Sequence, residues 1–159
     1  MIISILAVSF ITQMILSNFL TNSLPLFVIP ALIVVYPYFK DDLKYLAVCF
    51  IYGMFYDIFI SSFTLMNTFM FLLIGTIITI LNKQWNNNIF NNIIFFVMLD
   101  IVYQTVYYFI VSLIENISWT SYLNFSFILK TMIINIIFIS ILYIVTDKIS
   151  KKYKIYKID

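Results

Sequence analysis

The sequence is poor in the residues that most catalytic and metal-binding sites use. It has no histidine, no arginine, a single cysteine (Cys49) and only two glycines. One cysteine cannot build a disulfide framework, and without histidine no Cys/His metal site can form. We therefore expect no metal, no cofactor and no enzymatic activity. Cys49 lies in an apolar run, and we interpret it as a small buried core residue.

Charge is scarce as well. Charged residues make up 10% of the 159 residues, whereas hydrophobic residues make up 64%. Soluble domains carry roughly 25% charged residues, so the composition excludes an ordinary soluble fold and predicts an all-α integral membrane protein. At about 20 residues per span, six short helices use up the chain. We expect a single domain over residues 1–159, built as a six-helix transmembrane bundle.

The apolar runs place the six spans at about residues 1–20, 24–38, 45–63, 65–81, 93–114 and 127–146, with a basic tail at 147–159. The first run lacks the basic start and the cleavage site of a signal peptide, so we interpret it as a retained span. Pro25 suits the first turn of the second span, Pro30 predicts a kink in that span, and Pro37 marks its end. The charged segment 40–44 is expected to be a loop. Almost nothing joins the third and fourth spans, which predicts an antiparallel hairpin.

The lysines predict the orientation. With the N-terminus inside, the inner loops and the tail hold Lys40, Lys44, Lys83, Lys148, Lys151, Lys152, Lys154 and Lys157, whereas Lys130 lies at the outer end of the sixth span. Basic residues concentrate on the cytoplasmic side, so both termini are predicted to be cytoplasmic. The tail also suits anionic membrane lipid, although it serves equally well as a topology signal. No pattern indicates nucleic-acid binding.

Asp57 is the most informative charge, because it lies within an apolar run. Such a charge is costly at membrane depth unless it is paired or faces protein. Cys49, Gly53 and Asp57 recur at four-residue spacing, which places them on a helix face that another helix can approach closely. We favour a packing and polar-contact site, with a transport or catalytic carboxylate as the alternative. The long Lys130 side chain could reach Asp57 and form an ion pair; Glu115 is the rival partner of Lys130.

A second polar pattern lies in the fifth span. Asp100, Tyr103, Gln104 and Tyr107 occur at i, i+3, i+4 and i+7, so they share one helix face. In a bilayer such a face should point into the bundle or toward a partner protein. We favour an internal hydrogen-bond network, with a solute pathway or a docking surface as the alternatives.

Two further observations concern partners and chemistry. Trp119 and Tyr122 lie in the loop after the fifth span, suit the membrane interface, and are candidate partner contacts. The aspartates lie at different depths, Asp57 about 18 Å and Asp100 about 10 Å from the inner side at roughly 1.5 Å per residue. This disfavours an aspartyl protease, in which paired carboxylates share a proton.

The central hairpin resembles a known family. The run Gly53-Met54-Phe55-Tyr56-Asp57 is followed by a short polar break, then by Leu65-Met66-Asn67-Thr68-Phe69 and by Leu73-Ile74-Gly75. These segments resemble the MreD family of rod-shape-determining proteins, in layout over the whole chain and in motif over residues 52–75. The chain departs from the family pattern at Leu65, where a glycine is expected, and at Thr68, where a small residue is usual.

The resemblance implies a non-catalytic scaffold subunit of the cell-elongation complex, which makes peptidoglycan and determines cell shape, in the bacterial cytoplasmic membrane. It implies association with an MreC-like protein, and through it with MreB filaments and the RodA–penicillin-binding-protein synthase. Gly53, Asp57, Asn67 and Gly75 would be its structural and assembly residues. The family is similar in fold to the six-helix substrate-binding subunits of energy-coupling-factor transporters. The alternative function is therefore a substrate-binding subunit for a small, vitamin-type solute, with Asp57 and Asp100 lining a cavity.

Overall fold

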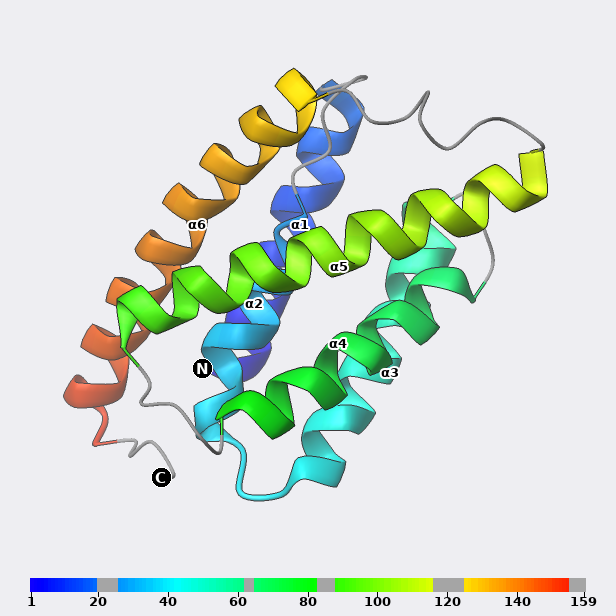
Figure 1. Cartoon of the computed structure of the whole chain (residues 1–159). Coiled ribbons are helices and arrows are strands. Elements are labelled where there is room, and N and C mark those ends of the chain that lie inside the picture. The colour runs from blue at the N-terminus through cyan, green and yellow to red at the C-terminus, as the bar shows by residue number, and fades with distance from the viewer. Residues whose placement is uncertain (20–25, 62–64, 83–87, 116–124, 155–159) are drawn as a thin grey trace.

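The computed structural model of the chain describes residues 1–19, 26–61, 65–82, 88–115 and 125–154. In these residues it has six α-helices and one short 3-10 helix, which confirms the all-α class. They are α1 (Ile2–Phe19), α2 (Val28–Val35), η1 (Tyr36–Tyr38), α3 (Asp42–Phe59), α4 (Met66–Asn82), α5 (Ile89–Glu115) and α6 (Phe125–Lys152). Figure 1 shows the N-terminus of the chain and the C-terminal ends of α2, α4 and α6 at one end of the bundle, with α3 and α4 side by side as a hairpin.

The first turn of α3 differs from the prediction. Segment 40–44 was expected to be a loop, but α3 begins at Asp42. Asp41 is extended (φ −136°, ψ 118°), and its side chain accepts a hydrogen bond from the Leu43 N–H at 3.1 Å. An aspartate at this position satisfies an N–H that has no partner within the helix. The charged segment therefore starts the helix, and its loop assignment was wrong from Asp42 onward.

Two further helix bounds have clear local causes. Pro30 lies in the first turn of α2, where the missing N–H would lack a partner in any case, so no kink is required there; Pro25 lies outside the described residues. Helix α6 runs beyond the predicted end of the sixth span into the basic tail. Lys151 and Asp147, one turn apart, form an ion pair at 2.6 Å in this extension, a spacing that supports helical structure.

Helix α2 is the centre of the bundle. All eight of its residues are buried, and it packs against α1, α4, α5 and α6. A helix that is apolar on every side is stable only when other elements surround it. The sequence VIPALIVV has only apolar side chains, so every side of α2 can be buried. This short helix therefore fixes the positions of the longer helices around it.

The outer surface of the bundle is largely apolar, and several polar side chains lie inside it alongside the apolar core. Large apolar side chains are exposed on the long helices, among them Ile11 on α1, Phe55 and Ile58 on α3, Phe69 on α4, Phe109 on α5 and Ile137 on α6. Among the buried polar side chains, those at the inward positions of α6 are Thr131, Asn135, Thr146 and Ser150. A soluble monomer rarely exposes so much contiguous apolar surface.

Two of the described helices are long and apolar enough to cross a membrane. They are the segments Ile89–Ile114 of α5 and Leu129–Lys152 of α6. Helix α3 has 18 residues but carries Asp42, Lys44 and Asp57. The apolar helices Ile2–Leu16, Val28–Tyr38 and Met66–Asn82 are shorter.

Candidate functional site

The Asp57 carboxylate joins the two helices of the α3–α4 hairpin. Oδ1 accepts hydrogen bonds from the backbone N–H and the side-chain Nδ2 of Asn67, at 3.1 and 2.9 Å. Oδ2 accepts from the backbone N–H and the hydroxyl of Thr68, at 2.8 and 2.7 Å. We call Asp57, Asn67 and Thr68 the hairpin clamp. The carboxylate caps the first turn of α4 from a neighbouring helix, at the positive end of the helix dipole.

Two glycines let the hairpin close. A Cβ on Gly53 would lie 2.5 Å from the Thr68 Cα, and one on Gly75 would lie 2.8 Å from the Cys49 sulfur. The first contact is with backbone, which cannot turn aside, whereas the second is with a side chain. Cys49, Gly53 and Asp57 thus lie on the face of α3 that meets α4. Thr68, which departs from the family pattern, donates two bonds to Asp57 and leaves the close approach intact.

Leu65 adopts the backbone conformation that glycine favours. It precedes α4 with a φ of 66°, in the left-handed region that costs an L residue about 1–2 kcal/mol. This is the position at which the family pattern has a glycine. The turn before α4 therefore places an L residue in an unfavourable backbone conformation.

The structure does not pair Asp57 with Lys130. Described residues make four hydrogen bonds to the carboxylate, and all four come from α4; the Lys130 side chain is exposed on α6. The prediction considered the reach of a lysine, but four donors already lie within hydrogen-bond distance of the carboxylate. The side chain of Glu115, the rival partner of Lys130, lies outside the described residues.

The polar face of α5 points into the bundle. Asp100 and Tyr103 are buried, and Gln104 donates from Nε2 to Asp100 Oδ2 at 2.7 Å. The Tyr103 hydroxyl donates to Asn67 Oδ1, so a chain of hydrogen bonds runs from Asp57 through Asn67 to α5. The two aspartates have separate partners. On this face Tyr103 and the Gln104–Asp100 pair make hydrogen bonds inside the bundle, while Tyr107 packs against Tyr103.

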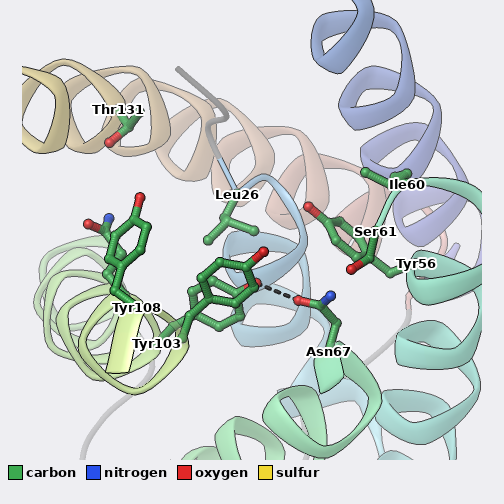
Figure 2. A pocket seen from close by; sticks show the side chains of 10 residues that line it. Leu26, Tyr56, Ile60, Ser61, Asn67, Tyr103, Tyr108 and Thr131 are labelled. Carbon is green, nitrogen blue, oxygen red and sulfur yellow. Dashed lines mark hydrogen bonds between the residues drawn. The ribbon is translucent and has the colours of Figure 1, made fainter. Parts of the chain in front are cut away.

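A cavity of about 220 Å³ lies beside this network. Four tyrosines line it, Tyr56 from α3 and Tyr103, Tyr107 and Tyr108 from α5, together with the amides of Asn67 and Gln104. Figure 2 shows Tyr56 and Ser61 on one side, Tyr103 and Tyr108 on the other, and Leu26 and Thr131 nearby. The cavity lies at the end of the hairpin where α3 ends and α4 begins.

The tyrosine rings pack against one another. Tyr103 and Tyr107 are stacked, with ring centroids 5.6 Å apart and an angle of 17° between the planes. Tyr107 and Tyr108 meet edge to face at 5.7 Å and 82°. Each aromatic contact restricts the rings, so the cavity wall is largely preformed.

The sequence revealed only part of this site. The predicted residues Asp57, Asn67, Asp100, Tyr103, Gln104 and Tyr107 lie in or next to the network, whereas Trp119 and Tyr122 lie outside the described residues. Tyr56 and Tyr108 were missed. They precede or follow predicted site residues directly, and only the angle between α3 and α5 brings them to one cavity.

Among the residues that the structure describes, no group of three or more histidine, cysteine, aspartate or glutamate side chains is placed to hold a metal ion. Comparisons of the chain with protein-family models, with curated proteins and with solved structures give no match.

Proposed function

We propose that the chain is a non-catalytic membrane scaffold of the MreD type, acting in the complex that elongates the cell wall. The observation that carries the proposal is the hairpin clamp. Both oxygens of Asp57 are used to hold α4 against α3, which is a structural role. Gly53, Asp57, Asn67 and Gly75, on which the family resemblance depends, all lie at this one contact between helices.

The proposal includes six membrane spans with both termini in the cytoplasm. Exposed apolar side chains on the long helices and buried polar ones support a bilayer environment. Helix α3 begins at the same end of the bundle at which α6 ends. Lys44 lies in the first turn of α3 and Lys40 just before it, and the last turns of α6 hold Lys148, Lys151 and Lys152. Cytoplasmic ends of membrane helices are rich in lysine, so this end faces the cytoplasm of a bacterial cell.

The proposed partner is an MreC-like protein. Of the two contact regions predicted for it, the polar face of α5 has Asp100 and Tyr103 buried in the bundle, and its Gln104 and Tyr107 line the cavity. The loop with Trp119 and Tyr122 therefore becomes the preferred contact, on the outer side. MreB filaments and the RodA–penicillin-binding-protein synthase would be reached through the MreC-like protein.

Co-purification tests the proposal. The tagged full-length chain, expressed with the MreC-like protein of the same genome, should retain that protein on the affinity resin, and depletion of the chain should turn rods into spheres. Asp57→Asn should weaken both effects, whereas Asp147→Asn, a carboxylate change at the cytoplasmic end of α6, should leave them intact. Normal rods after depletion, together with no retention of the MreC-like protein, would reject the scaffold function.

The tyrosine-lined cavity favours a second candidate, a substrate-binding subunit of a small-solute transporter. Its polar and aromatic lining is typical of ligand sites, and a scaffold has no need of it. Such a subunit should co-purify with an ATPase module and carry a bound solute. A reading frame for an MreC-like protein next to this one would support the scaffold, and a neighbouring transporter operon would support the second candidate.

A further inference from the structure

The cavity beside the hairpin clamp has the lining of a ligand site. We call it the tyrosine cavity, after Tyr56, Tyr103, Tyr107 and Tyr108, whose side chains line it with the amides of Asn67 and Gln104. Its volume is about 220 Å³, and an apolar protein cavity of about 150 Å³ binds benzene. The tyrosine cavity therefore has room for a molecule slightly larger than a single aromatic ring.

Two carboxyl groups lie next to residues that line the cavity. Asn67, which lines the cavity, is hydrogen-bonded to the Asp57 carboxylate, and Gln104, which also lines it, is hydrogen-bonded to the Asp100 carboxylate. Two buried carboxylates thus lie one side chain behind the wall. No lysine is among the described residues that line the cavity. Lys130 precedes the lining residue Thr131 in sequence, but its side chain is exposed.

The amide wall also offers an acceptor that the protein leaves unused. Gln104 Oε1 and Asp100 Oδ1 are buried, and neither has a hydrogen-bond partner among the described residues. A buried acceptor without a partner is costly. The Nε2 group of the same glutamine is already committed to Asp100 at 2.7 Å, which leaves the oxygen as the free end.

The aromatic wall suits a positively charged ligand. The face of a tyrosine ring carries partial negative charge, and cages of such rings recognise ammonium groups. We propose that the tyrosine cavity binds a small organic cation, an alkylammonium of about the size of choline. This ligand is independent of the scaffold function and would supply the substrate class of the second candidate.

Choline and 3,3-dimethylbutan-1-ol form the decisive pair of probes. They share shape and hydroxyl group and differ in charge. Binding to the full-length chain in a maltoside detergent, which has no choline headgroup, is measured by titration calorimetry. Choline should bind, and the neutral analogue should bind at least about 2-fold more weakly, since cation–π contacts contribute a factor of about 2 to 30 in affinity.

Substitutions on α5 locate the site. Tyr107→Leu removes a ring from the wall and should weaken choline binding by about 2- to 30-fold, while Tyr107→Phe keeps the ring and most of the affinity. Phe109→Leu is the matched control, because this ring is exposed on the same helix, and it should leave the affinity unchanged. If Tyr107→Leu does not fold, as judged by gel filtration, Tyr108→Leu takes its place.

Three results would overturn the inference: equal affinity for choline and its neutral analogue, no choline binding by the folded protein, or unchanged binding after loss of the ring. Retention of the MreC-like protein is measured separately and requires no choline. Failure of the cation site and failure of the scaffold function are therefore distinguishable.

Discussion

Asp57→Asn is the substitution that the structure predicts in most detail. The amide matches the carboxylate in size but replaces one acceptor oxygen with an NH2 group. Two of the four hydrogen bonds to α4 are then lost, and the new NH2 group faces the N–H or hydroxyl donors of α4. Hydrogen bonds to a charged group contribute about 1.5–3 kcal/mol each, so two of them amount to about 3–6 kcal/mol. Because the four bonds share one carboxylate and are not independent, we expect destabilisation near the lower value.

A double-mutant cycle with Thr68→Val isolates the contact. Valine keeps the shape of threonine and removes the hydroxyl that donates to Asp57 at 2.7 Å. The free energy of unfolding in detergent is measured for the parent, both single variants and the double variant. A coupling energy of about 1 kcal/mol or more is expected, within the range for residues in direct contact.

The control and the refuting result are both specific. Asp147→Asn changes a carboxylate at the end of α6 whose partner Lys151 is mostly exposed, and ion pairs of that kind contribute less than about 1 kcal/mol. Additive effects of Asp57→Asn and Thr68→Val, within about 0.5 kcal/mol, would show that the hairpin clamp does not form as described. So would an Asp57→Asn variant as stable as the parent.

Three further substitutions test neighbouring features by thermal unfolding in detergent. Gly53→Ala should destabilise the hairpin by about 1–3 kcal/mol, because the new Cβ meets the Thr68 backbone at 2.5 Å; an unchanged midpoint would contradict the close approach. Leu65→Gly should stabilise by up to about 1 kcal/mol, since glycine adopts a positive φ without strain, and a clear loss of stability would count against that turn geometry. Lys130→Gln should change stability by less than about 0.5 kcal/mol. A loss of stability comparable to that of Asp57→Asn would instead support the ion pair predicted from the sequence.

The sequence predicted the hairpin because its signals are local. Small residues four positions apart on α3 mark a face for close packing, and the short polar break requires the next helix to turn back. The inward direction of Asp100 and Tyr103 followed from the cost of polar groups facing lipid. In each case one helix carries all of the information that the prediction needs.

The remaining features depend on two helices at once. The donors that satisfy Asp57 come from the first turn of α4. The sequence prediction used only the depth of Asp57 along its helix and the length of the Lys130 side chain, and therefore chose Lys130 as the partner. Tyr56 and Tyr108 line one cavity although they belong to α3 and α5, and only the folded arrangement of the two helices brings them together. The early start of α3 depends on the Asp41 side chain, which caps the helix. The sequence prediction assigned this charged segment to a loop and did not identify the cap.

The hairpin clamp also has a consequence for how the protein is made. During synthesis α3 emerges first, with Asp57 near its end and its hydrogen-bond donors still ten or more residues away along the chain. In the proposed membrane protein, an unpaired aspartate opposes insertion of its helix by up to about 2.5–3.5 kcal/mol, the cost at the helix centre. Helix α4 removes that cost as soon as its first turn forms. We therefore expect the translocon to release α3 and α4 into the bilayer together, as one preassembled pair.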